Sequence, residues 1–97
     1  MRPPVVWFPE ANDDLLETRR WYDNIRPALG ERFALAVEAT IEAIAEHPLQ
    51  FPAVHRVRRR AGVRRFPCGI FFEVQEDRIV VMAFFHGRRN PRHWQAR

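Results

Sequence analysis

The apolar residues of this 97-residue chain change their spacing near Phe51-Pro52. From about residue 10 up to that point they recur every three or four residues, which is the period of an amphipathic helix. After it they alternate with polar residues or form short β-favouring runs, which is typical of strands. The chain is therefore expected to fold as an α+β protein. Its length allows one domain, which we place over residues 1–97, and its 46% share of hydrophobic residues is enough for one core.

Two helices are expected before Pro48. The first covers about residues 10–24 and gathers acidic residues near its start, where the helix dipole favours negative charge. Arg26-Pro27 interrupts it, and proline is well tolerated in the first turn of a new helix. The second helix carries an apolar stripe formed by Leu29, Phe33, Val37, Ile41 and Ile44. Because few residues join the two helices, we expect them to pack as an antiparallel hairpin.

Four segments have the composition of strands. They cover residues 5–8, 54–60, 63–74 and 79–85. Ala61-Gly62 and the polar residues 75–78 supply the turns between the last three, so those strands should pair as hairpins. Residues 79–85 are apolar on both faces, which predicts a central strand. The predicted order is β-α-α-β-β-β, with the helix hairpin packed on one face of a mainly antiparallel sheet.

Charge is divided unevenly along the chain. All 16 basic residues are Arg, and the net charge is +4. Residues 1–46 hold 5 Arg and 9 acidic residues, whereas residues 47–97 hold 11 Arg and 3 acidic residues. This basic half predicts an anionic partner for one part of the fold. Alternatively, its densest run is a solvated edge strand whose charges discourage strand addition; that run comprises Arg56, Arg58, Arg59 and Arg60.

Several classes of protein and site are excluded or disfavoured by the sequence. No apolar run approaches the roughly 20 residues of a membrane-spanning helix, and no secretory signal is visible, so we expect a cytoplasmic protein without membrane contact. The one cysteine, Cys68, falls on the inward face of its strand, which predicts a small buried hydrophobe. No phosphate-binding glycine loop occurs, and no metal or cofactor is expected, because the histidines lack the spacing of ligands; they are His47, His55, His86 and His93.

Two C-terminal segments carry the most specific motifs, Arg64 to Phe72 and His86 to Trp94. Shorter motifs accompany them at Trp21-Tyr22, Leu29 to Phe33 and His47 to Pro52. Together they resemble the RelE/ParE superfamily, the toxins of bacterial type II toxin–antitoxin modules. The resemblance extends from Val5 to Trp94 and is nearer to the ParE-like, plasmid-stabilisation branch.

The resemblance implies a small basic toxin that arrests growth and is neutralised by a cognate antitoxin in a hetero-oligomer. ParE-like members poison DNA gyrase by binding it, without a catalytic reaction of their own. RelE-like members are endonucleases that act on mRNA at the ribosome. A third alternative is a nucleic-acid-binding module without toxicity, which would bind bare DNA or RNA in a salt-dependent way.

The residues expected in a nuclease site are only partly present. His86 would be its general acid or base, with Arg65 and Arg89 holding the phosphate. However, nucleases of this superfamily usually carry an arginine just before the hydrophobic centre of the middle strand, where Gly69 stands here. They also tend to place a tyrosine in the C-terminal tail, whereas the one tyrosine of this chain is Tyr22. The binding toxin is therefore the favoured hypothesis, and the endonuclease is the alternative.

The resemblance places the target surface on the sheet and tail of the basic half. Its expected contacts are Arg65, His86, Arg88, Arg89 and Trp94. For His86 the alternative is a structural role, in which it ends the last strand and hydrogen-bonds a neighbour. For Trp94 it is a ring that anchors the tail on the sheet.

The expected antitoxin contacts lie on the helix hairpin. Leu35 is opposite the core stripe of the second helix, and Trp21 lies beside that of the first. An antitoxin segment laid along the hairpin and the sheet edge, as a helix or a strand, would contact both.

Overall fold

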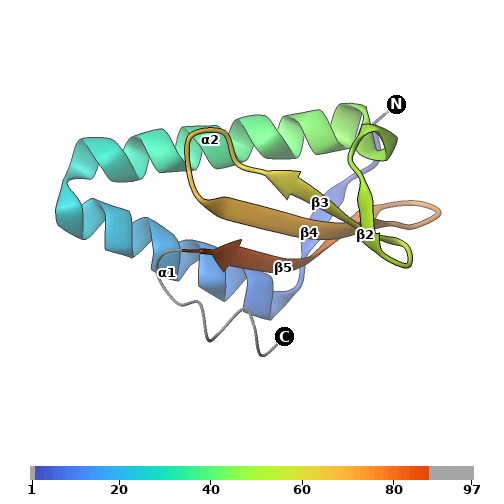
Figure 1. Cartoon of the computed structure of the whole chain (residues 1–97), viewed down its shortest axis with the longest axis horizontal. Helices are drawn as coiled ribbons and strands as arrows, with labels where there is room; N and C mark the ends of the chain where they lie inside the picture. Colours follow the sequence, from blue (N-terminus) through green and yellow to red (C-terminus); the bar gives the residue numbers. More distant parts are fainter. Residues whose placement is uncertain (1, 88–97) are drawn as a thin grey trace.

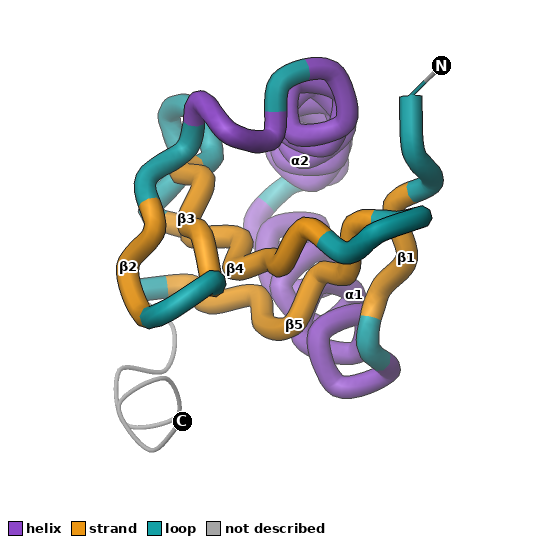
Figure 2. Tube along the Cα trace, turned by 90° about the vertical axis from the view of Figure 1, so that its right-hand side faces the viewer, coloured by secondary structure: helices purple, strands orange, loops and turns teal. Residues whose placement is uncertain are grey.

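Five strands form one sheet, and two long helices pack side by side against it (Figures 1 and 2). The computed structural model describes residues 2–87. Its elements are β1 (Val5–Trp7), α1 (Pro9–Ile25), α2 (Pro27–Glu46), a 3-10 turn (Pro48–Gln50), β2 (Ala53–His55), β3 (Arg58–Gly62), β4 (Cys68–Val74) and β5 (Ile79–His86). The predicted α+β architecture is confirmed, with the helix hairpin on a mostly antiparallel sheet.

The sheet has the order β1-β5-β4-β3-β2. β1 runs parallel to β5, and every other neighbouring pair is antiparallel. β5 therefore has strands on both sides, as its two apolar faces predicted. A bulge in its pairing with β4, where Phe71 opposes Ala83 and Phe72 opposes Val81, shifts the alternation of β5 by one residue. The shift lets Val81 and Phe84 both lie in the core.

The helix hairpin begins each of its helices with a proline, Pro9 in α1 and Pro27 in α2. Proline fits the first turn because an N–H there has no intrahelical partner. Arg26 joins the helices in an extended conformation, and the predicted antiparallel hairpin is confirmed (Figure 1). The helices approach closely at Gly30, where a β-carbon would lie 1.6 Å from the Asp23 carboxylate.

The core lies between the helices and the inner face of the sheet. The predicted stripe of α2 faces it. Phe33, Val37 and Ile44 are buried, while Leu29 and Ile41 are half-buried. The strands contribute Ile70 and Phe72 from β4 and Phe84 from β5, among others. Aromatic rings meet edge to face inside this core, as Phe33 does with Phe84 at 6.0 Å between centroids.

Two turns differ from the sequence prediction. The segment expected as one strand over residues 54–60 is a hairpin of β2 and β3, and it turns at Arg56, whose φ is 52°. The turn expected at Ala61-Gly62 falls later, at residues 63–67, where Arg65 has a φ of 70°. Positive φ is usually signalled by glycine or asparagine, and here arginines adopt it. The prediction therefore missed the first turn and placed the second one too early.

Within residues 2–87, no helix is both long enough and apolar enough to cross a membrane.

Candidate functional site

His86 ends β5 inside the protein, with 6% of its surface exposed. Its Nε2 lies 2.6 Å from the hydroxyl of Tyr22, so this buried hydrogen bond joins β5 to α1. The rings of Trp21 and Tyr22 lie 5.1 and 5.2 Å from the imidazole. The ring is thus enclosed by α1 and presents little surface to a macromolecule. This position favours the structural alternative for His86 over a contact with target or substrate.

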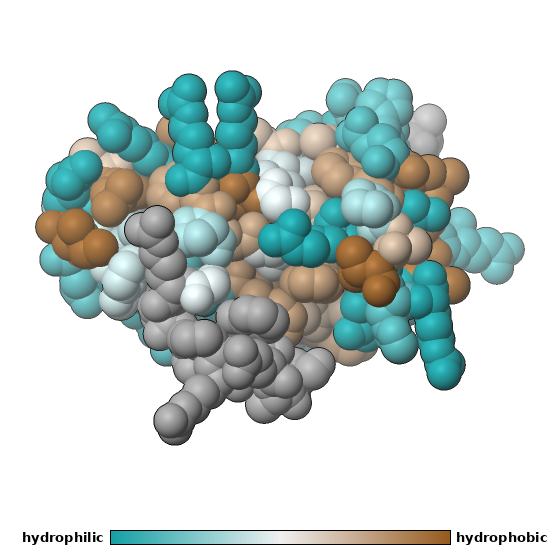
Figure 3. All heavy atoms as spheres, viewed as in Figure 1, coloured by the Kyte–Doolittle hydropathy of each residue, from teal (hydrophilic) through white to brown (hydrophobic). Residues whose placement is uncertain are grey.

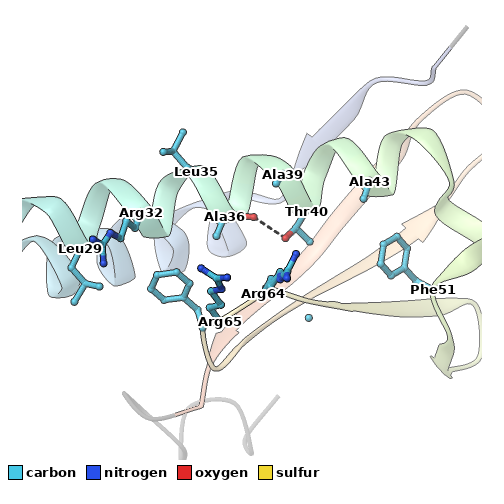
Figure 4. Close-up of a pocket in the computed structure, with 12 residues that line it drawn as sticks. Leu29, Arg32, Leu35, Ala36, Ala39, Thr40, Ala43, Phe51, Arg64 and Arg65 are labelled. Atoms are coloured by element: carbon cyan, nitrogen blue, oxygen red, sulfur yellow. Dashed lines mark hydrogen bonds between the residues drawn. The ribbon is translucent and has the colours of Figure 1, made fainter.

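A groove of about 1040 Å³ runs between α2 and the loop that joins β3 to β4 (Figure 4). Three alanines of α2 line it, Ala36, Ala39 and Ala43, and Phe51 closes one end. Arg64 and Arg65 rise from the loop toward the helix (Figure 4). The groove therefore combines an apolar floor with a cationic rim.

The expected antitoxin and target residues are not separated in space as the sequence suggested. Leu35, an expected antitoxin contact, lines the same groove as Arg65, an expected target contact. Its side chain lies on the outer side of α2 and is 59% exposed (Figure 4). Trp21, the second expected antitoxin contact, is 38% exposed and packs on His86.

Apolar side chains are scattered among hydrophilic ones on the face shown in Figure 3, rather than gathered in one broad patch. Isolated apolar residues of this kind are normal on protein surfaces. Exposure of Leu35 and Trp21 alone therefore does not mark an interface. The groove beside Leu35 is the stronger indication of a binding surface, because it is concave and carries arginines at its rim.

The hairpin of β2 and β3, called the basic hairpin below, carries three arginines on β3 that have different environments. Arg58 forms an ion pair with Glu73 of β4 at 3.5 Å. Arg59 donates to the backbone carbonyl of Phe51 at 2.6 Å and so ties β3 to the end of the 3-10 turn. Arg60 instead lies over the ring of Phe71 on the face of the sheet turned away from the helices. Each of these three arginines therefore makes a contact of its own, so the run is not simply a solvated edge strand.

A model of the family described as "ParE toxin of type II toxin-antitoxin system, parDE" matches residues 5–91. The chain belongs to this family. The match covers both helices and all five strands, so the groove, the Tyr22–His86 pair and the basic hairpin all lie within the ParE toxin domain.

A solved structure titled "Chromosomal ParDE TA system from P. aeruginosa" has the same fold as this ParE toxin. The TM-score is 0.75 at 16% sequence identity, and the match covers 88% of this chain and 96% of the other. Comparison with curated proteins gives no match.

Three expected target contacts of the toxin, Arg88, Arg89 and Trp94, lie outside the described residues. Among residues 2–87, no group of three or more His, Cys, Asp or Glu side chains is arranged to hold a metal ion.

Cys68 is 3% exposed, and burial raises the pKa of its thiol to about 12. The thiol is therefore protonated at neutral pH and behaves as the buried hydrophobe that its position predicted.

Proposed function

We propose that this ParE toxin arrests growth by binding DNA gyrase, and that a cognate antitoxin neutralises it. Membership of the ParE family carries the proposal. The site geometry supports a binding toxin over a nuclease, because His86 is enclosed and hydrogen-bonded to Tyr22. A general acid or base must reach its substrate within hydrogen-bond distance, and this imidazole faces α1 instead.

The target surface is proposed to combine the basic β3–β4 region with the C-terminal tail. Arg65 lies within the described residues and is exposed in the loop that joins β3 to β4. Its φ of 70° is a conformation that arginine rarely adopts, so the surrounding fold must hold it there. Backbone hydrogen bonds fix the loop, from the N–H of Val63 to the carbonyl of Cys68 at 3.1 Å and from Phe66 to Val63 at 3.1 Å. Arg88, Arg89 and Trp94 complete the proposed surface.

The antitoxin is proposed to occupy the groove between α2 and the β3–β4 loop. The small side chains of α2 leave room for a helix or an extended segment with apolar residues. The cationic rim, formed by Arg32, Arg64 and Arg65, favours a segment that carries carboxylates. Leu35 lies at its outer margin, and Trp21 is proposed as a second contact on α1. An antitoxin in this groove would cover Arg65, so one contact would block part of the target surface.

Induction of the toxin in growing cells tests the proposal. Mapping of mRNA 5′ ends by primer extension should show no new ends linked to codons, while gyrase–DNA cleavage complexes should accumulate. Co-expression of the protein encoded by the adjacent reading frame should restore growth. New codon-linked ends without cleavage complexes would contradict gyrase poisoning and support the endonuclease instead.

A further inference from the structure

The face of the sheet that is turned away from the helices holds one arginine against an aromatic ring and two glycines. The Cζ of Arg60 lies 5.9 Å from the centroid of the Phe71 ring. A β-carbon at Gly69 would lie 3.0 Å from its Nε and 3.1 Å from its Nη2, and one at Gly62 would lie 3.6 Å from its Nη1. Gly62 and Gly69 are partners across β3 and β4. The guanidinium thus lies over a cross-strand pair of glycines.

The two glycines leave room for the guanidinium to lie flat along the sheet. Glycine weakens a strand, and where it occurs in one it often marks the close approach of another group. Here the approaching group is the Arg60 side chain itself, which would have to shift to make room for a β-carbon at Gly69. The planar guanidinium presents donors in a rigid fork that matches a carboxylate or a phosphate.

Arg60 differs in its charge balance from its neighbour on the same face. Arg58 is neutralised by Glu73, its partner across the strands. No ion pair involves Arg60 among residues 2–87. The positive charge of Arg60 is therefore available to an outside partner.

A small pocket of about 160 Å³ adjoins the guanidinium. It is lined by Arg60, Pro67, Gly69, Phe71, Phe85 and Gly87. The rings of Phe71 and Phe85 meet edge to face at 5.1 Å between centroids, and the N–H of Gly87 donates to the carbonyl of Pro67 at 2.8 Å. The pocket is thus an apolar hollow with one cation.

We propose that Arg60 and this pocket bind an aspartate or glutamate side chain on the protein that the toxin poisons. Arginine and aromatic residues enclosing a small pocket are typical of the residues that dominate protein–protein affinity. A nucleic-acid strand would favour several cations following its phosphates, and among the described residues this pocket has one. The inference rests on the proposed function, because it locates a contact of the same target-binding toxin.

The contact also bears on Gly69, which stands where nuclease relatives are expected to carry an arginine. In this chain a guanidinium reaches that place from the neighbouring strand. The guanidinium of Arg60 therefore lies beside the backbone of Gly69.

Purified variants can test this contact against gyrase. Arg60→Ala should raise the toxin concentration needed to inhibit supercoiling about tenfold or more. Arg60→Lys should weaken inhibition too, because an ammonium lacks the flat fork. Gly69→Val should do the same by displacing the guanidinium. Arg78→Ala is the matched control, since Arg78 is exposed in the β4–β5 hairpin, where its Nε donates to the Oε1 of Gln75 at 3.0 Å. This variant should stay within about twofold of the wild type.

Unchanged melting temperature and antitoxin binding would show that the variants remain folded. If the wild type inhibits gyrase and Arg60→Ala inhibits it equally well, the inference is wrong. Tight, salt-sensitive binding of a labelled single-stranded oligonucleotide that is lost in Arg60→Ala would also overturn it, in favour of nucleic acid.

Growth arrest separates this inference from the gyrase proposal. If the wild type does not inhibit gyrase but still arrests growth, loss of arrest in Arg60→Ala and its persistence in Arg78→Ala would support the contact with another protein target. Equal arrest by both variants would overturn it.

Discussion

The hydroxyl of Tyr22 and the Nε2 of His86 lie 2.6 Å apart in a buried hydrogen bond that joins residues 64 positions apart. Tyr22 is on α1 and His86 ends β5, so the bond connects the helix hairpin to a central strand of the sheet. The bond also gives the buried imidazole of His86, which lies in a motif expected to be functional, a polar partner inside the fold.

Tyr22→Phe is expected to lower the free energy of unfolding by about 1–3 kcal/mol, because it removes a partner from the buried imidazole. Urea denaturation of this variant, of His86→Ala and of the double variant measures the coupling in a mutant cycle. A coupling near zero would show that the bond contributes nothing to stability.

His86→Gln is expected to retain growth arrest at a temperature where circular dichroism shows it to be folded. A structural His86 has no part in chemistry, whereas loss of a general acid or base would cost roughly 10²–10⁴-fold in activity. Arrest and mRNA ends should be measured together. Loss of arrest in a folded variant would restore His86 as a functional residue.

Cys68 should give stability a distinct dependence on alkaline pH. Its pKa is about 12 in the folded protein, above the ordinary 9.0, so the unfolded state loses its thiol proton first as pH rises. The contribution is complete below pH 9 and is lost between about pH 9 and 12, by up to about 1.4 kcal/mol per pH unit.

Urea denaturation of the wild type and Cys68→Ala at several alkaline pH values measures this contribution as the difference between the two slopes. Equal slopes would contradict the raised pKa. Alkylation by iodoacetamide at neutral pH should likewise be slow in the folded protein and fast in urea.

Arg65→Gly is expected to keep or raise the free energy of unfolding, by up to about 1 kcal/mol, because glycine adopts a φ of 70° without strain. Arg64→Gly is the control, because it removes the same charge at the preceding position, where φ is not positive. This variant should lower the free energy of unfolding by about 0.5–1 kcal/mol. Thermal denaturation of the two variants compares them directly. The opposite order would show that Arg65 is not strained.

Leu35→Glu should weaken antitoxin binding about tenfold or more, by placing a charge at the margin of the proposed groove. Leu49→Glu is the control, because Leu49 is similarly exposed, at 67% against 59%, and lies outside that groove. Calorimetric titration with the antitoxin measures both. Equal affinities would place the antitoxin elsewhere.

The spacing of apolar residues was sufficient to predict the helices, the core stripe and the order of the elements. Phe33, Val37 and Ile44 repeat at helical spacing, and this local pattern determines which face of α2 is buried. One turn was missed and one was placed too early, and both errors have the same physical cause. Arg56 and Arg65 adopt a positive φ, which an arginine in a sequence does not indicate.

The site was harder to predict because its contacts join distant parts of the chain. Tyr22 bonds His86 across 64 positions, and Leu35 shares a groove with Arg65 only after α2 packs on the sheet. Nor did the sequence separate Arg60 from the other arginines of its run. Strand pairing does so, by placing Glu73 opposite Arg58 and Phe71 opposite Arg60.

The central claim is that this ParE toxin acts on gyrase by binding, and a supercoiling assay with purified components tests it most directly. The toxin should inhibit gyrase in a concentration-dependent way and trap a cleaved gyrase–DNA complex, and prior mixing with the antitoxin should abolish both effects. Full supercoiling without trapped complex, at toxin concentrations well above that of gyrase, would contradict the claim.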